Sequence, residues 1–459
     1  MNKYFSFFAT LVVASTMLCS CLGGNDDDVD YGSDTAISSF TLNTIYRTMH
    51  TQASDGSDST YTSTLSASNY KFSIDHLNGI IENLDSLPKW TNPDKVLCTV
   101  TAYNSGVIAY LKPTSGDTLF AYNSADTMDF SKPIEFRVYS PDGSNACRKY
   151  TVSINIHQEE GDSMRWEMLT SNSNIAFEKK KLYSLGSDMF LMGVKDGATT
   201  IYKTSAADGR EWENITANVS LDDKAYNNTV IYNNEFYTFS SGTLYKSADA
   251  KTWATVSTPD IENLVAAGSS MLFGIGNNKI KYSIDGGATW ADDTMSDEAE
   301  FLPKKDFSYA VTSVKSNAET ERIIIAGNLM NESDCRNAMV WSKVIEKRAD
   351  SYEYSWTRVV TRTERHGLPY TDNLSMTAYD DMLVSMNNEN FLTSTDNGMV
   401  WNIDTTLYKR PEGFNASATE VTMAVDANKW LWIVDKEGEV WKARINRLAW
   451  REEQTAFKE

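Results

Sequence analysis

Short runs in which apolar and polar residues alternate extend along most of the chain. Residues 36–42, 134–139 and 149–156 show this alternation, and a cluster of Ser, Pro, Asp and Gly separates the last two runs. Alternation at period two predicts half-buried β-strands, and a turn cluster between two such runs predicts a β-hairpin. No convincing long amphipathic helix interrupts the second half. The pattern therefore predicts an all-β protein.

The second half repeats one plan of strand, turn, strand and a polar motif that ends in tryptophan. The marking residues are Trp166, Trp212, Trp253, Trp290, Trp356, Trp401 and Trp450. Their gaps are 46, 41, 37, 66, 45 and 49 residues, which is the period of a four-stranded propeller blade. Six intervals predict a six-bladed β-propeller, in which the longest gap is one blade with insertions. Trp166 and Trp450 compete for the same outer position, so seven blades stay open, as does a β-sandwich with chance tryptophan spacing.

The motif before these tryptophans resembles the Asp-box, S-x-D-x-G-x-T-W. Residues 283–290 fit it in full, residues 394–401 depart only at the threonine, and residues 205–212 and 247–253 are degraded copies. The Asp and Gly of such a motif form a tight turn, and its tryptophan packs into the blade. This structural role is expected for Asp208, Trp212, Asp249, Trp253, Asp285, Gly287, Trp290, Asp396, Gly398 and Trp401.

The N-terminus has the features of a targeting signal. Lys3 precedes an apolar stretch, residues 4–18, which has the length of a signal peptide and is shorter than a membrane-spanning helix. Residues 18–21 read Leu-Cys-Ser-Cys, which resembles the bacterial lipoprotein signal, where cleavage precedes a cysteine that becomes acylated. The resemblance implies lipid attachment at Cys21. The alternative is an ordinary signal peptide with two incidental cysteines.

Four segments follow from these features. We expect a signal peptide over residues 1–20, an acidic flexible tether over 21–34, a first β-module over 35–158 and the propeller over 163–456. The Asp-Gly hairpin that ends the first module resembles the closing hairpin of immunoglobulin-like modules in Bacteroidetes lipoproteins. The tether is similar to the acidic leader of surface-exposed lipoproteins of that group, with a plain polar spacer as the alternative. Resemblance to two-domain Bacteroidetes lipoproteins spans the chain and implies an immunoglobulin-like sandwich before the propeller, but no reaction.

Charge and cysteine content narrow the class of partner and the compartment. The chain has 42 Lys and Arg against 62 Asp and Glu, a net charge of −20, which repels phosphates and argues against nucleic acid as a partner. Three cysteines remain beyond the signal, Cys98, Cys147 and Cys335. Cys98 and Cys147 lie in or beside strands of the first module, which allows a disulfide in an oxidising envelope compartment. Three separate thiols are the alternative.

No cofactor or metal signature stands out. The four histidines, His50, His76, His157 and His366, are far apart and lack the spacing of metal ligands. The chain also lacks a G-x-S-x-G elbow, a P-loop and a dinucleotide-binding fingerprint. The chain also lacks the Arg-Ile-Pro motif that a sialidase has near its N-terminal end, which argues against a sialidase. Another kind of glycosidase would need two carboxylates, and 62 acidic residues neither exclude such a pair nor select one.

Two places could contribute ligand contacts. Residues 361–370 gather charge and aromatic rings in a connection, where Arg362, Arg365, His366 and Tyr370 could pair with carboxylates or stack on a sugar. Trp430 lies two residues before Trp432, so the two rings could share one strand face. A solvated loop and burial within the blade are the respective alternatives.

These features together favour a lipid-anchored protein of the cell outer membrane, facing the surface or the periplasm. We expect the propeller to bind a polysaccharide or an envelope protein without catalysis, and we expect acylated Cys21 to contact the membrane lipid. A carbohydrate-active enzyme and a scaffold lipoprotein remain alternatives, since a propeller does not specify function.

Overall fold

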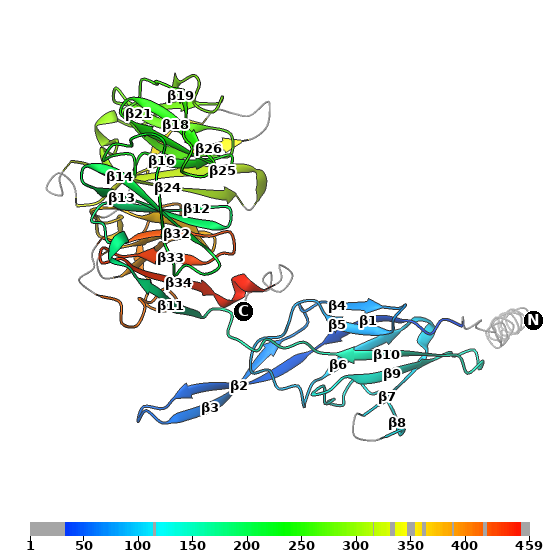
Figure 1. The fold of residues 1–459 in the computed structure, drawn as a ribbon. Coiled ribbons are helices and arrows are strands. Elements are labelled where there is room, and N and C mark those ends of the chain that lie inside the picture. Colours follow the sequence, from blue (N-terminus) through cyan, green and yellow to red (C-terminus); the bar gives the residue numbers. More distant parts are fainter. Residues whose placement is uncertain are drawn as a thin grey trace, which may run out of the picture. The chain divides into compact units, whose positions relative to one another are not determined.

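The computed structural model describes residues 33–112, 116–314, 316–330, 336–346, 354–359, 364–387, 390–415 and 420–450. The chain divides into two compact units, one ending at Glu160 and the other formed by Gly161–Trp450 (Figure 1). Strands dominate both units, so the protein is all-β as predicted. The described helices are short 3₁₀ turns: η2 (Tyr103–Ser105), η3 (Ser173–Ile175), η4 (Ala299–Phe301), η5 (Glu364–His366) and η6 (Asn446–Ala449).

The N-terminal unit contains a six-stranded sheet of order β4-β5-β10-β9-β7-β8 and two two-stranded sheets, β1-β6 and β2-β3. The six strands are β4 (Phe72–Asp75), β5 (Ile80–Asn83), β10 (Cys147–Ser153), β9 (Ile134–Tyr139), β7 (Val107–Leu111) and β8 (Leu119–Ala121). The others are β1 (Ile37–Leu42), β6 (Cys98–Ala102), β2 (Thr44–Gln52) and β3 (Asp58–Ser66). Neighbouring strands are antiparallel except β5 and β10, which run parallel.

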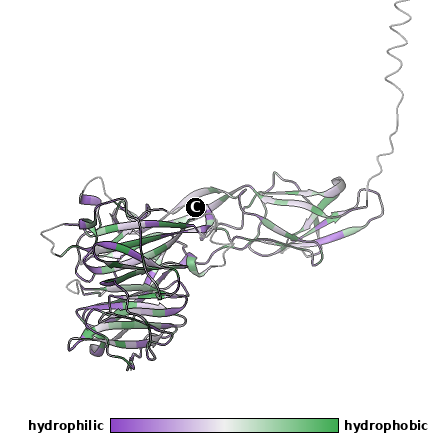
Figure 2. Ribbon diagram, turned by 90° about the horizontal axis from the view of Figure 1, so that it is seen from above, coloured by the Kyte–Doolittle hydropathy of each residue, from purple (hydrophilic) through white to green (hydrophobic). Residues whose placement is uncertain are grey.

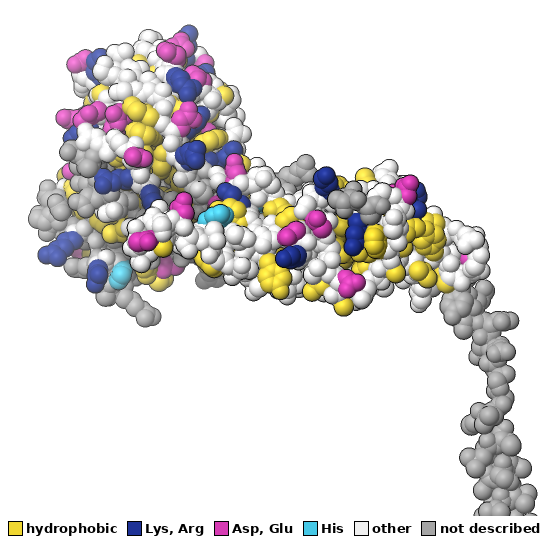
Figure 3. Space-filling view, turned by 90° about the horizontal axis from the view of Figure 1, so that it is seen from below, with side chains coloured by type: hydrophobic (Ala, Val, Ile, Leu, Met, Phe, Trp, Pro, Cys, Tyr) yellow, Lys and Arg dark blue, Asp and Glu magenta, His cyan; other side chains and the backbone are white. Residues whose placement is uncertain are grey.

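One hydrophobic core joins the β1-β6 sheet to the six-stranded sheet. Phe40 of β1 packs edge-on against Phe136 of β9, and both rings are buried. The hairpin predicted at the end of this unit is formed by β9 and β10, in the register that places Phe136 opposite Tyr150. Hydrophobic side chains also reach the surface of this unit (Figure 3). Its immunoglobulin-like character stays a prediction.

The disulfide considered possible between Cys98 and Cys147 is not present in the structure, in which both residues are free thiols. Cys98 points into the core from β6, with its Sγ 3.5 Å from the sulfur of Met128. Cys147 begins β10 in another sheet and faces solvent. Strand alternation decides which face each side chain takes, and here the two faces differ. Cys21 and Cys335 lie outside the described residues.

The second unit is a six-bladed β-propeller, and each blade is a four-stranded antiparallel sheet within the described residues. The first three blades are β12 (Lys180–Leu185), β13 (Asp188–Lys195), β14 (Ala198–Ser205), β15 (Glu213–Ile215); β16 (Thr229–Tyr232), β17 (Glu235–Ser240), β18 (Thr243–Ser247), β19 (Ala254–Ser257); and β20 (Asn263–Ala267), β21 (Leu272–Gly276), β22 (Lys279–Ser283), β23 (Ala291–Asp292). The fourth and fifth are β24 (Lys305–Val314), β25 (Asn317–Asn328), β26 (Met339–Glu346), β27 (Thr357–Arg358); and β28 (Met376–Tyr379), β29 (Met382–Met386), β30 (Phe391–Ser394), β31 (Asn402–Ile403). The 66-residue tryptophan gap is thus a single enlarged blade.

The sixth blade closes the ring with a strand from the other end of the unit. Its order is β11-β34-β33-β32, made of β11 (Met164–Ser171), β34 (Glu439–Ile445), β33 (Leu431–Val434) and β32 (Thr422–Val425). Trp166 of β11 lies opposite Ala443 of β34, so Trp166 takes the outer position. Trp450 instead follows η6, outside the sheet. The two tryptophans do not compete, and six blades result.

Apolar residues of neighbouring blades interlock between the sheets. In one such cluster Phe236 and Trp253 of the second blade pack with Phe190 and Ile201 of the first. Hydrophobic positions run along the strands of this unit (Figure 2). The innermost strands β16, β20, β24, β28, β32 and β12 contact one another in that order, which places their starting ends together on one face.

Candidate functional site

A cavity of about 830 Å³ opens on the face of the propeller where the innermost strands begin. All six connections that lead into those strands contribute to its wall, which consists of Glu178, Lys179, Asp223, Lys224, Tyr226, Asn227, Asn228, Glu262, Asn263, Lys304, Lys305, Asp306, Phe307, Met330, Asp372, Asn373 and Glu420. Its volume falls in the range of small-molecule sites. We call it the central cavity.

Every blade brings one acidic side chain to the central cavity. These acids are Glu178, Asp223, Glu262, Asp306, Asp372 and Glu420. Four lysines and four asparagines share the wall: Lys179, Lys224, Lys304, Lys305, Asn227, Asn228, Asn263 and Asn373. The wall thus offers carboxylate acceptors, ammonium donors and amides that do both. Such a surface suits a ligand rich in hydroxyl or amide groups.

Lys305 organises one side of the central cavity. Its Nζ lies 3.3 Å from Asp372 and 3.5 Å from Asp306, and 5.3 Å from the centre of the Tyr370 ring. The Tyr370 hydroxyl donates to Asp372 at 3.2 Å. Partial burial by itself lowers the pKa of Lys305, but hydrogen bonding and the nearby negative charges raise it above its ordinary value. Lys305 therefore stays a cation that fixes both carboxylates.

Two further lysines stabilise the base of this face. Lys180 is 2% exposed, and its Nζ donates to the carbonyls of Phe177 at 2.8 Å and Glu420 at 2.7 Å. It therefore ties the first blade to the sixth. Burial lowers the pKa of Lys180 to about 8. Lys181 donates to the carbonyl of Phe307 in the fourth blade, and burial lowers its pKa to about 7.

The Asp-box residues lie at the opposite end of the blades. β20 starts at the central cavity, β21 returns to that face and β22 leaves it again, so the box after β22 is on the far face. There Asp285 accepts from the Thr289 amide at 2.9 Å and from the hydroxyls of Ser283 and Thr289 at 2.8 and 2.6 Å. These hydrogen bonds lower the pKa of Asp285 to about 2.

The other boxes use their carboxylates in the same way. Asp396 accepts from the Val400 amide at 2.9 Å, and Asp249 accepts from the Lys251 and Thr252 amides at 2.9 and 2.7 Å. In the most degraded copy, Asp208 pairs instead with Arg210 at 2.9 Å. Each box tryptophan donates its Nε1 to a carbonyl of its own turn: Trp212 to Gly209, Trp253 to Ala250, Trp290 to Gly287 and Trp401 to Gly398.

The structure separates the ligand candidates of the 361–370 connection. Tyr370 lies beside the central cavity through Lys305 and Asp372. Arg365 and His366 are exposed, and the His366 carbonyl accepts from the Trp401 amide at 2.8 Å, which places this turn beside the next blade's box. Arg362 lies outside the described residues.

The tryptophan pair of the last blade does not form a stacking platform. Trp432 is fully buried, and its Nε1 donates to Asp426 at 2.9 Å. Trp430 precedes β33 and is half-buried, with Arg444 4.6 Å and Lys442 5.3 Å from its ring centre. It also lies beyond the end of β32, whereas the central cavity is at the start of that strand. Trp430 is therefore remote from this cavity.

Sequence reasoning missed the six acids of the central cavity, although a signal was present. They recur at intervals of 45, 39, 44, 66 and 48 residues, and these intervals parallel the tryptophan gaps because both follow the blades. Each acid stands just before an inner strand or at its first residues. Among 62 acidic residues, only the blade register could have singled them out.

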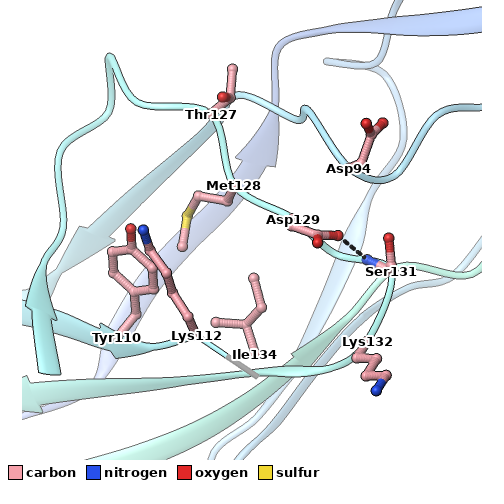
Figure 4. Close-up of a pocket in the computed structure, with 9 residues that line it drawn as sticks. All are labelled: Asp94, Tyr110, Lys112, Thr127, Met128, Asp129, Ser131, Lys132 and Ile134. Atoms are coloured by element: carbon pink, nitrogen blue, oxygen red, sulfur yellow. Dashed lines mark hydrogen bonds between the residues drawn. The ribbon is translucent and has the colours of Figure 1, made fainter. Parts of the chain in front are cut away.

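A smaller cavity of about 250 Å³ lies in the N-terminal unit (Figure 4). Met128 and Ile134, which belong to the core, form its base, and Tyr110 and Lys112 of β7 and the residue after it stand beside them. The Asp129 carboxylate at the rim accepts from the Ser131 amide at 2.9 Å. This carboxylate therefore serves a local turn, and Lys112 places its Nζ 4.4 Å from the centre of the Phe120 ring.

The described residues contain no group of three or more His, Cys, Asp or Glu side chains placed to hold a metal ion. Nor do they contain a helix that is long and apolar enough to cross a membrane.

Comparison with protein families matches both units of the chain. Residues 160–453 match the DUF6242 beta propeller domain, and residues 40–154 match the DUF6242 N-terminal domain, a domain of unknown function. No curated protein matches the chain.

Three solved structures match more than half of this chain at low sequence identity. Virginiamycin B lyase from Staphylococcus aureus is 10% identical, with 73% of this chain and 98% of that chain covered and a TM-score of 0.34. The Aleuria aurantia lectin is 10% identical, covering 57% and 90%, with a TM-score of 0.36. A quinonprotein alcohol dehydrogenase-like protein from Bacteroides thetaiotaomicron is 9% identical, covering 79% and 97%, with a TM-score of 0.33. At these scores the function of none of them is carried over.

Proposed function

The chain belongs to the DUF6242 family, whose larger domain is a β-propeller, and from that premise we propose that it is a lipid-anchored cell-envelope protein whose propeller binds a glycan without catalysis. The central cavity is the proposed binding site. One observation carries the proposal: all six blades contribute polar, hydrogen-bonding side chains to one cavity of about 830 Å³. Convergence of this kind is what distinguishes a site from a surface.

The chemistry of the wall favours a glycan over an apolar ligand. Carboxylates accept hydrogen bonds from sugar hydroxyls, lysines donate to hydroxyl and ring oxygens, and asparagines do both. The two aromatic residues of the wall, Tyr226 and Phe307, are buried, so they offer little face for stacking. Tyr370 at the side is half-buried and carries the cation of Lys305 over its ring. Recognition would therefore rest on hydrogen bonds.

The absence of catalysis is supported by how two of the cavity acids are engaged. Asp306 accepts from the side-chain amide of Asn328 at 3.0 Å and pairs with Lys305. Asp372 pairs with the same lysine and accepts from Tyr370. A glycosidase needs one carboxyl group that delivers a proton and a second carboxylate that acts as nucleophile or base. Two carboxylates held by one cation suit binding better.

The test is a binding and turnover panel on the chain from residue 22 onward, with host and dietary polysaccharides. We expect retardation in affinity gels without release of reducing ends. Asp223, which is exposed on the cavity wall, gives the diagnostic variant: Asp223→Asn should weaken binding about tenfold, the loss of one charge-assisted hydrogen bond. The control is Glu211→Gln, an exposed acid within the degraded box of residues 205–212 and away from the cavity.

The outcomes separate the alternatives. Released reducing ends would replace the proposal with a carbohydrate-active enzyme. Failure to bind any polysaccharide would rule out a glycan as the ligand and leave an envelope protein as the proposed ligand. Equal effects of Asp223→Asn and Glu211→Gln would move the site away from the central cavity.

The lipid anchor is proposed from the Leu-Cys-Ser-Cys motif that ends at Cys21. Cells that produce the chain should incorporate radioactive palmitate into it, and Cys21→Ala should abolish the label. A Cys21→Ala chain that still labels would contradict lipid attachment at this residue. An outer-membrane location is expected on the same basis, and fractionation of the same cells measures it.

A further inference from the structure

The β2-β3 hairpin of the N-terminal unit forms a sheet of only two strands. Its nine paired positions run from Thr44 opposite Ser66 to Gln52 opposite Asp58. The hairpin extends away from the other strands of its unit (Figure 1), and most of β3 is exposed or half-exposed. A two-stranded sheet alone is marginally stable in water, so this hairpin would gain from a third strand.

The register shows which backbone groups face outward. The Ala53 amide donates to the Ser57 carbonyl at 2.8 Å, and the Ala67 amide donates to the Asn43 carbonyl at 2.8 Å. Along the ladder, both pairs are separated from the pair Met49–Tyr61 by an even number of residues. Because hydrogen-bonded pairs alternate along an antiparallel ladder, the odd-numbered residues of β3 bond to β2. The N–H and C=O groups of Thr60, Thr62 and Thr64 therefore point to the open edge.

The β2 edge of the hairpin is paired over its first half, whereas the β3 edge is not paired within the part of the chain that the structure describes. On the β2 side, the Thr48 amide donates to the Trp90 carbonyl at 3.0 Å, and the Asn92 amide donates to the Tyr46 carbonyl at 2.8 Å. No described residue makes a corresponding backbone bond to Thr60, Thr62 or Thr64. From residue 59 to residue 66 the strand has no charged residue and no proline, which are two of the features that protect an edge from pairing.

We propose that β3 pairs with β3 of a second copy of this chain, antiparallel and centred on Thr62, so that two hairpins form a four-stranded sheet. In this register Thr60 of one copy lies opposite Thr64 of the other, and the outward N–H and C=O groups of all three threonines find partners. The pairing is isologous, as expected of a twofold dimer.

The charge and side-chain pattern of β3 favours a second copy of the same strand as the partner. In the symmetric register, Asp58, the one charged residue of β3, lies opposite Ser66, so no like charges meet. The threonines on the shared face pair with one another, which is favourable in cross-strand positions. The natural sequence of β3 can therefore pair with a second copy of itself. The inference concerns the N-terminal unit and is independent of the proposed glycan site.

The test uses charge pairs that only this register can satisfy, in the chain from residue 22 onward. The like-charge variant, Thr60→Lys with Thr64→Lys, places two lysines opposite two lysines and should abolish dimers. The opposite-charge variant, Thr60→Lys with Thr64→Glu, places each lysine opposite a glutamate of the other copy and should restore them. Thr51→Lys, on β2, is the control for added charge. Sedimentation velocity measures the dimer fraction, and thermal unfolding verifies that every variant folds.

The expected result is association of the original chain, of the opposite-charge variant and of the Thr51→Lys control, while the like-charge variant stays monomeric. The edge is short, so association is expected to be weak, and the measurement should extend to about 1 mM. A chain that remains monomeric over this range would overturn the proposal. Equal association of the like-charge and opposite-charge variants would also overturn it, because the contact would then lie elsewhere.

Discussion

Two adjacent glycines of the complete Asp-box give a direct measure of how tightly neighbouring blades interlock. Gly286 and Gly287 have φ angles of +68° and +89°, a region that costs an alanine about 1–2 kcal/mol. They differ in what a side chain would meet. A Cβ on Gly287 would lie 2.3 Å from Cδ2 of Leu244, a fully buried residue of the preceding blade, whereas a Cβ on Gly286 has its nearest neighbour, the Tyr237 hydroxyl, at 3.3 Å.

Gly286→Ala should therefore lower the free energy of unfolding by about 1–2 kcal/mol through backbone strain. Gly287→Ala adds steric overlap in a close-packed region, which typically costs about 1–3 kcal/mol more. For a domain of this size the difference corresponds to a melting temperature lower by roughly 2–4 °C per kcal/mol. Of the 12 tryptophans, only Trp90 lies outside the propeller, so the midpoint of unfolding by tryptophan fluorescence reports on this unit.

Leu244→Val separates the overlap from the strain. It removes the atoms that the new Cβ would meet, at a cost of about 1 kcal/mol. In the Leu244→Val background, the loss of unfolding free energy caused by Gly287→Ala should fall to about the loss caused by Gly286→Ala. If the two glycine variants are equally stable in the original chain, or if Leu244→Val gives no relief, the idea that the box packs on the preceding blade is wrong.

Three further predictions follow from burial. Trp401 is 2% exposed in a cluster that joins the fourth and fifth blades. Trp401→Ala should therefore lower the free energy of unfolding by about 3–5 kcal/mol, and Trp401→Phe should lower it by much less. The midpoints of urea unfolding measure both changes. The pKa of Lys180 is lowered to about 8 in the fold and is about 10.4 when unfolded, so between these pH values the unfolded chain binds more protons, and Lys180 should add up to about 3 kcal/mol of stability as the pH rises. Lys180→Met should remove this part of the rise and leave the part that the buried Lys181 contributes, and a variant that keeps the whole rise would contradict the assignment. Burial raises the pKa of Cys98 to about 12, whereas Cys147 is exposed. A Cys335→Ser chain from residue 22 onward should therefore show one reactive thiol when folded and two when unfolded without reductant. If no thiol reacts in either state, the two cysteines form a disulfide.

The propeller could be predicted from the sequence because its blades repeat. Packing between sheets demands a tryptophan at about the same place in every blade, and this demand leaves a period of 37–66 residues in the chain. Ring closure could not be predicted in the same way. β11 pairs with β34 from the far end of the unit, with Trp166 opposite Ala443, and a pairing so distant in sequence leaves no local pattern by which to choose between Trp166 and Trp450.

The disulfide and the ligand candidates show where local reasoning fails. Cys98 and Cys147 both stand in strands, but the contacts of the sheets decide that one thiol is buried against Met128 and the other faces solvent. Trp432 and Tyr370 are equally conspicuous in the sequence. One is buried by its own blade and the other reaches the central cavity through Lys305, and only the assembled ring distinguishes them.

The position of an acid along its blade gives a physical reason for dividing the acids of the propeller into two groups. At the far end, carboxylates such as Asp285 and Asp396 are held by the amides and hydroxyls of their own turns, so a ligand would have to displace hydrogen bonds on which the turn depends. At the starting end, Asp223 and Glu178 are exposed on the wall of the central cavity. Antiparallel strands send successive connections to alternate faces, so a four-stranded blade keeps its box and its cavity acid on opposite faces. Substitutions of Asp223 and Glu178 should therefore alter binding with little effect on stability, whereas substitutions of the box aspartates should do the reverse.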